Sequence, residues 1–218
     1  MMELDLIVTD ELLSTTRAIR KRMDLERPVP RSIIAECVRL ATQAPTAGNS
    51  QGWNFVVITD PDLRAKAADI YRRAGAVYLR EAAETSAEPQ TKRVYQSASY
   101  LADVLDQVPV LVIPCIEGRV EGESTAMAAS LYGSIIPAAW SFALALRARG
   151  IGTAWTTIHL VLENEMAALL GIPANFTQVA MIAVGWITGN SLRPAIRRPV
   201  ENVMSWDGWT HPSTADKA

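Results

Sequence analysis

The sequence of this 218-residue chain predicts an α+β fold. Segments with helical periodicity alternate with a few separated strands, an arrangement typical of this fold class. Hydrophobic residues make up 49% and charged residues 20% of the chain, both close to the average for globular domains. The chain is long enough to bury a core without disulfides or structural metals. We therefore expect a single domain spanning residues 1–218, in which a central, mostly antiparallel sheet is flanked by helices.

The first half of the chain should contain three helices and one strand. Asp10 is a plausible cap for the first helix, Pro30 suits the first turn of the second, and Asp60-Pro61 is a cap followed by proline at the first turn of the third. β-Branched and aromatic residues predict the strand. In order, we expect a helix over residues 10–23, a helix from Pro30 to Ala44, a turn-rich loop over residues 46–52, a strand over residues 53–59 and a helix from Asp60 to about Glu84.

The second half begins with a linker-like stretch at residues 85–90, which predicts a lid or a mobile excursion. The most apolar helix should be buried nearly all round, and Pro137 inside it should cost about 3 kcal/mol unless the helix kinks. After the linker we expect a helix to about Asp106, a buried strand over residues 108–116, a polar loop over 117–123, the apolar helix over 124–149, a strand over 150–157, a helix over 162–170 ended by Gly171, a strand over 179–187 and an irregular C-terminal arm over about 189–218.

Charge and composition exclude several functions. The net charge is −2, which argues against nucleic-acid binding through bulk positive charge. Two cysteines and two histidines provide neither a disulfide framework nor a zinc motif. The N-terminus is acidic where a signal peptide is basic, and the longest strongly apolar run, about residues 108–116, is too short for a bilayer. We expect a soluble, cytoplasmic protein without membrane or metal partners.

The first candidate site segment is residues 16–22. In a helix, Arg17, Arg20 and Lys21 would stand at i, i+3 and i+4 and share one face. Three cations on one face favour a bound anion, and the planar guanidinium suits phosphate. A solvated basic face explains the same pattern.

The second segment, residues 44–53, joins a helix end, a polar loop and a strand. Asn49 and Gln51 carry both donors and acceptors, so they can read the edge of a planar heterocycle. The alternative is an ordinary helix-to-strand turn.

The third segment, residues 150–157, combines glycines that allow close backbone approach with threonines that can hydrogen-bond a ligand. It is not a GxGxxG motif, and entry into a buried strand is the alternative.

The fourth segment, residues 193–199, carries Arg197 and Arg198 in an extended stretch. By itself it reads equally well as a solvated tail.

In order and spacing, these four segments together resemble the nitroreductase family over roughly residues 9–207. The family's RRSxR-like, PSxxNxQPW-like, GLGTxW-like and RKPLEE-like motifs stand here as TRAIR (16–20), PTAGNSQGW (45–53), GIGTAW (150–155) and RRPVEN (197–202). The residues 133–150 also resemble the family's long central helix. The chain departs from the family at Thr16, Ala18 and Gly52, where Arg, Ser and Pro are usual.

The resemblance implies a homodimer that holds FMN at its interface and exchanges its C-terminal arms. Arg17, Arg20 and Arg197 would hold the phosphate, with weaker contacts at Thr16 and Ala18. Residues of the polar loop would line the flavin from the other subunit, and the end of the third segment would run past its ring. These further cofactor-binding residues are Pro45, Thr46, Asn49, Gln51, Trp155, Thr156 and Thr157.

The activity implied is ping-pong hydride transfer from NADH or NADPH, through FMN, to an electron-poor acceptor such as a nitroaromatic or a quinone. The flavin does the chemistry, so we assign no catalytic residue. His159 follows the flavin-facing segment closely, but a packed structural histidine is the favoured interpretation. Residues 71–98 and 117–124 are candidates to complete the substrate pocket. Alternatives are a different flavin reaction (dehalogenation, flavin fragmentation or azoline oxidation) and a flavin-binding protein without turnover.

Overall fold

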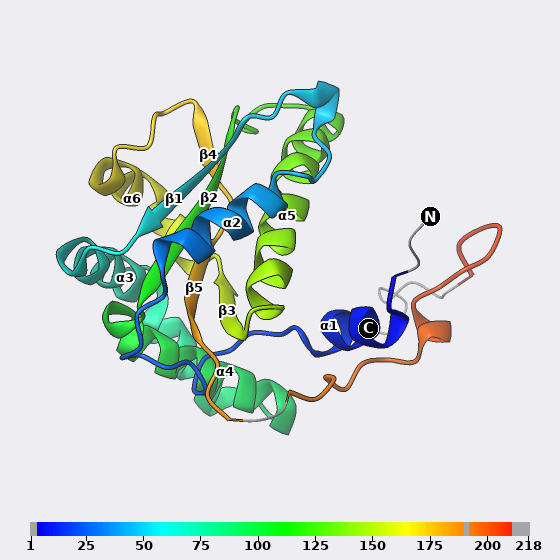
Figure 1. The fold of residues 1–218 in the computed structure, drawn as a ribbon, viewed down its shortest axis with the longest axis horizontal. Coiled ribbons are helices and arrows are strands. Elements are labelled where there is room, and N and C mark those ends of the chain that lie inside the picture. The colour runs from blue at the N-terminus through cyan, green and yellow to red at the C-terminus, as the bar shows by residue number, and fades with distance from the viewer. Residues whose placement is uncertain (1–3, 190–191, 211–218) are drawn as a thin grey trace.

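The computed structural model describes residues 4–189 and 192–210, and its centre is an antiparallel sheet (Figure 1). The strands stand in the order β1-β2-β5-β3, and the short β4 pairs with the end of β2. Every strand pair is antiparallel, which confirms the predicted sheet. The strands are β1 (Trp53–Ile58), β2 (Val110–Glu117), β3 (Ile151–Thr156), β4 (Phe176–Gln178) and β5 (Met181–Trp186).

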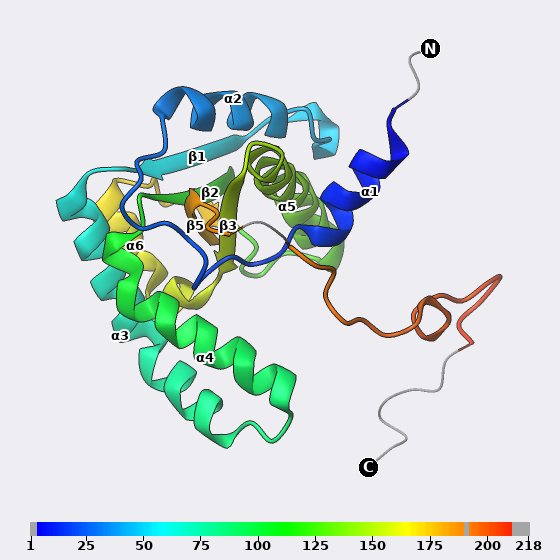
Figure 2. The ribbon, with the colours of Figure 1, turned by 60° about the horizontal axis from the view of Figure 1, so that its bottom comes forward.

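Helices cover both faces of the sheet (Figure 2). The alternation of side chains along β2 divides the core, because successive residues of a strand point to opposite faces. Val110 and Val112 join the cluster under α2 and α5, whereas Leu111 and Ile113 join the cluster under α3 and α4. The helices are α1 (Leu6–Thr15), α2 (Arg31–Ala41), α3 (Pro61–Thr85), α4 (Pro89–Val104), α5 (Thr125–Arg147) and α6 (Glu163–Leu170).

Capping residues explain several helix boundaries. The Asp60 carboxylate accepts a hydrogen bond from the Leu63 amide at 2.9 Å, as expected for a cap before Pro61. Ser124 caps α5 in the same way through the Met127 amide. Gly171 ends α6 in the left-handed conformation, with a φ of 66°. These boundaries follow the sequence closely because caps are local interactions.

The predicted helix over residues 10–23 is wrong. The helix begins after Asp5, whose carboxylate accepts from the amides of Ile7 and Val8, and it ends at Thr15. The following residues run beside the edge strand β3. Ala18 forms a parallel bridge with Thr153, and the Ile19 amide donates to the Thr153 carbonyl at 2.8 Å. Pairing with the sheet therefore replaces the helical hydrogen bonds that the sequence predicted.

Two glycines make room for this segment. A Cβ on Gly152 would lie 2.7 Å from the Ile19 Cβ, and a Cβ on Gly185 would lie 2.6 Å from the Met23 Cγ. Gly152 was expected to allow close approach to a ligand. In the structure it allows Ile19, which is buried, to pack directly on β3.

Gly152→Ala should lower the free energy of unfolding by about 1–3 kcal/mol, the usual cost of overpacking a core. The clash involves a Cβ atom, which cannot move without its backbone. Urea denaturation measures the change, and Gly208→Ala is the control, because a Cβ there meets nothing within 4 Å. Equal stability of the two variants would contradict this account of the close contact.

The helix α5 is less buried than predicted. Met127, Ile136 and Trp140 are exposed, while Ile135, Ala139 and Phe142 face the core. The helix continues through Pro137 without a break. An 18-residue window of this helix has a mean hydropathy of 1.4, so by length and composition alone the helix could cross a bilayer, contrary to the expectation from the sequence. Its packing on β2, β3 and α2 is that of a core helix with one uncovered face.

The linker-like residues 85–90 contain the turn between α3 and α4, and their predicted role as a lid or mobile excursion stays a prediction. Glu88 caps α4 by accepting from the amides of Gln90 and Thr91, so only residues 86–88 separate α3 from α4. The two helices form a hairpin that extends beyond the sheet (Figure 2). Gly75 interrupts the helical geometry of α3 where the Ile158 side chain packs against it.

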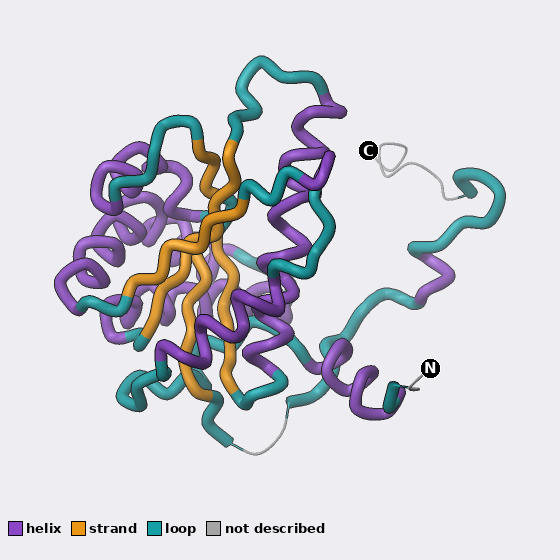
Figure 3. Tube along the Cα trace, turned by 45° about the horizontal axis from the view of Figure 1, so that its top comes forward, coloured by secondary structure: helices purple, strands orange, loops and turns teal. Residues whose placement is uncertain are grey.

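The C-terminal arm leaves the body of the chain and passes below α1 (Figure 2). Figure 3 shows it as loop with a single helical turn, Val200–Asn202. Ile196, Val203 and Trp206 are exposed along it. The predicted arm of residues 189–218 lies partly outside the described residues, namely at 190–191 and 211–218.

Candidate functional site

A basic cavity of about 430 Å³ lies where the segment after α1 meets α4 and the start of the arm. Five cationic residues and one serine line it, and no acidic residue does so among residues 4–189 and 192–210. The cavity is therefore electropositive and suited to an anion. The lining residues are Arg17, Ala18, Ile19, Arg20, Lys21, Arg22, Ser97, Leu192 and Arg193.

Arg17 and Arg20 are the two predicted phosphate ligands in this cavity. Arg20 is partly buried, and its Nη1 donates to the Ser97 hydroxyl at 3.0 Å. Arg17 is exposed, and its Nη1 donates to the Arg193 carbonyl at 3.3 Å. Within residues 4–189 and 192–210, neither guanidinium forms an ion pair with a carboxylate. Although the shared helix face does not form, both arginines reach one cavity.

The other predicted phosphate contacts are placed differently. Thr16 uses its hydroxyl to donate to the Leu12 carbonyl at the end of α1. Ala18 lies in the cavity wall. Arg197 is exposed and donates to the Ile196 carbonyl, and it does not line the cavity. Within one chain the arm reaches the cavity through Leu192 and Arg193 instead.

The polar loop after α2 has a constrained backbone. Gly48, Asn49 and Gln51 all have positive φ, at 59°, 53° and 51°. Asn49 and Gln51 are not glycines, and such conformations cluster at functional sites. The Gln51 side chain donates to the Asn49 side chain at 3.1 Å, and both side chains are exposed. The loop therefore presents its two amide side chains together at the surface.

The same loop is fastened to the N-terminal half of α5. The Ala47 amide donates to the Ser134 hydroxyl at 2.9 Å, and the Trp53 indole donates to the Ser134 carbonyl at 2.7 Å. Pro45 is exposed and Thr46 is half-buried, with its hydroxyl accepting from the Gln51 amide at 3.2 Å.

The loop after α2 lies toward the N-terminal end of α5, whereas the segment that follows α1 starts near its C-terminal end (Figure 1). Ser134 anchors the loop, whereas Arg147, at the other end, donates to Thr15 just before the arginine segment. Ser134 and Arg147 are thirteen positions apart, which corresponds to about 20 Å along a helix. The two predicted flavin-contacting regions are thus anchored at separate positions along α5.

The end of β3 brings a further polar group to the site. Thr156 is half-buried and points toward α3, where its Oγ1 lies 3.0 Å from the Tyr71 hydroxyl. Burial raises the pKa of Tyr71, and the bond to Thr156 and the charge of Arg20 oppose that change. Trp155 packs on the α2–α5 side and Thr157 is exposed. Tyr71 begins the segment 71–98 that was predicted to complete the substrate pocket, but no sequence pattern indicated its contact with Thr156.

His159 is fully buried, and its ring nitrogens make no hydrogen bond within the described part of the chain. Burial lowers its pKa to about 4, with Glu163 and Gln178 opposing the shift. The ring is therefore neutral near pH 7, as a packed structural histidine would be.

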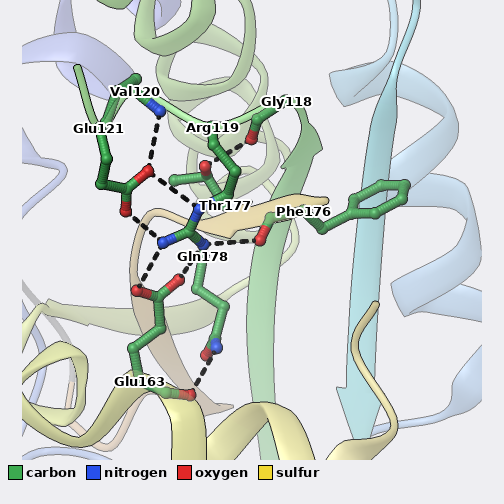
Figure 4. Close-up of polar contacts among 8 residues, drawn as sticks. All are labelled: Gly118, Arg119, Val120, Glu121, Glu163, Phe176, Thr177 and Gln178. Carbon is green, nitrogen blue, oxygen red and sulfur yellow. Dashed lines mark hydrogen bonds and ion pairs between the residues drawn. The ribbon is translucent and has the colours of Figure 1, made fainter. Parts of the chain in front are cut away.

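Arg119 anchors the loop that follows β2 (Figure 4). It donates to Glu163 at 2.7 Å, to the Phe176 carbonyl at 3.0 Å, and to Glu121 within the same loop. Gln178 in turn donates to the Glu163 carbonyl at 3.0 Å. The predicted substrate segment, residues 117–124, is therefore held to α6 and β4 at its start.

Arg119→Met should lower the free energy of unfolding by about 1–3 kcal/mol, because it leaves the partly buried Glu163 carboxylate without its cation. The control, Arg39→Met, breaks the exposed pair with Glu36 and should cost below about 1 kcal/mol. Thermal and urea unfolding measure both changes. If Arg119→Met lowers the free energy of unfolding no more than the control does, the Arg119 network does not stabilise the fold.

Solved structures with this arrangement of sheet and helices are nitroreductase-like flavoproteins. The chain aligns with a BluB-like flavoprotein from Clostridium difficile 630 with a TM-score of 0.70 and 21% identity, covering 94% of this chain and all of the other. The fold class is therefore that of the nitroreductase-like proteins. The chain belongs to the Nitroreductase family, whose model matches residues 13–186.

Curated relatives of the chain carry different activities in their names. It is 28% identical to 5,6-dimethylbenzimidazole synthase of Rhodospirillum rubrum over 163 residues, 73% of each chain. It is 26% identical to iodotyrosine deiodinase 1 of Rattus norvegicus over 192 residues, which cover 86% of this chain but 65% of the deiodinase. It is 28% identical to NADH dehydrogenase of Thermus thermophilus over 214 residues, 89% and 97% of the two chains.

Proposed function

We propose that the protein is an FMN-dependent oxidoreductase that transfers hydride from NADH or NADPH to an electron-poor organic acceptor such as a nitroaromatic or a quinone. The observation that carries this proposal is the basic cavity, in which Arg17 and Arg20 have no carboxylate partner among the described residues. Two guanidinium groups in an electropositive pocket fit a phosphate monoester. The same pocket would repel cations.

The residues present also fit the rest of a flavin. Asn49 and Gln51 present amide donors and acceptors that match a heterocycle with N–H and C=O groups. The end of β3 adds the Thr156 hydroxyl and the backbone near Thr157. FMN, when bound, supplies the hydride chemistry. The chain would fix the phosphate, orient the ring and hold the second substrate against it, and none of these tasks needs a side-chain nucleophile.

The site is complete only in a homodimer. The polar loop and the basic cavity are separated along α5, so each flavin would contact the arginines of one chain and the loop of its partner. The exposed Ile136 and Trp140 form an apolar face on α5, and Ile7 and Leu13 expose further apolar surface on α1. Apolar area of this kind is typical of permanent interfaces.

The C-terminal arm would complete the dimer by exchange. The strand β1 has an open edge, and a groove of about 610 Å³ runs between it and α2. Ile34, Val38 and Phe55 contribute apolar surface to this groove. The arm is extended and exposes Ile196, Val203 and Trp206. An extended segment that pairs with an open strand edge satisfies both sets of backbone groups. In this proposal residues 1–218 form a single domain.

The direct test is the visible absorption spectrum of the purified protein, followed by anaerobic addition of NADH or NADPH. Flavin bands that bleach on addition support the reductase. A protein that carries no flavin and neither binds nor reduces added FMN contradicts the proposal.

A second candidate retains FMN but catalyses another reaction, and the similarity to a deiodinase and to 5,6-dimethylbenzimidazole synthase favours it. Product analysis with nitroaromatics, quinones and halogenated phenols separates the two. A third candidate is a flavin-binding protein without turnover, which the weaker phosphate contacts at Thr16 and Ala18 would suit. It differs from both enzymes because its flavin bands would not bleach when NADH or NADPH is added. We also propose a cytoplasmic location, where the two free, buried cysteines would stay reduced.

A further inference from the structure

Tyr71 is a buried hydroxyl beneath the candidate flavin site. It comes from α3, is 1% exposed, and lies among the largest buried side chains of the core. Its neighbours in the core cluster are apolar, such as Ala68, Leu101 and Ala154. A phenylalanine would fill this space without needing a hydrogen-bond partner, so packing alone does not explain the hydroxyl.

The hydroxyl meets Thr156 at the end of β3. The two oxygens lie 3.0 Å apart, and the Ile158 amide makes a longer contact of 3.5 Å to the same Thr156 oxygen. A threonine hydroxyl can accept two hydrogen bonds and donate one. If both Tyr71 and Ile158 donate to it, its accepting positions are filled and its own proton must be donated elsewhere.

The protonation of Tyr71 is consistent with this direction. Burial raises the pKa of Tyr71, so the phenol keeps its proton at neutral pH, while the bond to Thr156 and the positive charge of Arg20 oppose that change. A phenol is also a stronger acid than an aliphatic alcohol. Arg20 is itself held by Ser97 and lines the basic cavity. Tyr71 thus contacts the end of β3 through Thr156, and the charge of Arg20 in the cavity wall acts on it.

We propose that Tyr71 is a positioning residue that fixes Thr156 as a hydrogen-bond donor toward the flavin. The relay runs from the Tyr71 hydroxyl to the Thr156 hydroxyl, whose proton would then point into the site. This inference rests on the proposed FMN site and extends it to a residue in α3. Tyr71 itself does not contact the cofactor or the substrate.

The test is a double-mutant cycle on Tyr71→Phe and Thr156→Val in the full-length protein. Both substitutions keep side-chain volume nearly constant and remove only hydroxyl chemistry. The readouts are the FMN dissociation constant from fluorescence quenching, the absorption maximum of bound FMN, and the rate of its reduction by NADH or NADPH. Tyr100→Phe is the matched control, because that tyrosine lies on the outer side of α4, in the wall of a separate surface pocket.

We expect Tyr71→Phe to shift the flavin spectrum and to slow flavin reduction about threefold to tenfold, while the unfolding temperature stays within a few degrees. Combining Tyr71→Phe with Thr156→Val should change the spectrum and the reduction rate no further than Thr156→Val alone, because the relay is already broken. Wild-type behaviour of Tyr71→Phe, or additive effects of the two substitutions, overturns the relay while leaving the proposed function intact. A wild-type protein that binds no FMN contradicts the proposed function, and this inference with it.

Discussion

Replacing Arg17 and Arg20 together by alanine should weaken FMN binding by a factor of about 10² or more. Each charge-assisted hydrogen bond to a phosphate contributes about 1.5–3 kcal/mol, and neither arginine has another anionic partner among the described residues. The purified double variant should therefore carry no flavin and be colourless. Fluorescence titration with FMN measures how much affinity is lost.

The control for this double variant is Arg39→Ala, an arginine of α2 paired with Glu36 on the surface, which should leave FMN affinity unchanged. Riboflavin gives a second comparison. Because riboflavin lacks the phosphate, its affinity should change far less than that of FMN. Arg197→Ala measures the third predicted phosphate contact, and weaker binding would place that arginine at the phosphate in the assembled protein. Full retention of FMN by the double variant would refute the phosphate assignment.

Deleting residues 201–218 should convert the dimer to a weakly associating or monomeric chain and should also release flavin. The deletion removes Val203 and Trp206, which are exposed along the arm and would be buried on a partner. Buried aromatic side chains often dominate the binding energy of an interface. Analytical ultracentrifugation measures the association, and circular dichroism reports whether the sheet and helices remain.

Deletion of residues 211–218 alone is the matched control, because it keeps Trp206 and most of the arm. This shorter chain should remain dimeric and yellow. If the longer deletion also remains dimeric with unchanged flavin content, the arm is not exchanged. The dimer would then rest on the uncovered faces of α1 and α5 alone.

Local signals in the sequence predicted most of the fold. Asp60 with Pro61, Ser124 and Gly171 mark helix ends through interactions with their nearest neighbours, so these ends could be located without any tertiary information. The β-branched runs that form β1, β2 and β5 were also recognised. The short β4 was missed, because three residues carry too little pattern to identify a strand.

The sequence also determined the chemistry available to the candidate site. The arginines of residues 16–22 and the amides of residues 45–52 stand in the order that identifies the family. Their residue types predicted an anion site and a polar loop, and the structure contains both a basic cavity and such a loop. Their actual contacts with a cofactor stay a prediction until flavin binding is measured.

Only the tertiary structure decided how these segments meet. Residues 16–23 have helical spacing, yet they run along β3, because pairing of Ala18 and Ile19 with Thr153 satisfies backbone groups that an edge strand leaves open. The contact between Tyr71 and Thr156 joins residues 85 positions apart, and no local pattern encodes it. The uncovered face of α5 follows from the same cause, because which side of an apolar helix is buried depends on what packs against it.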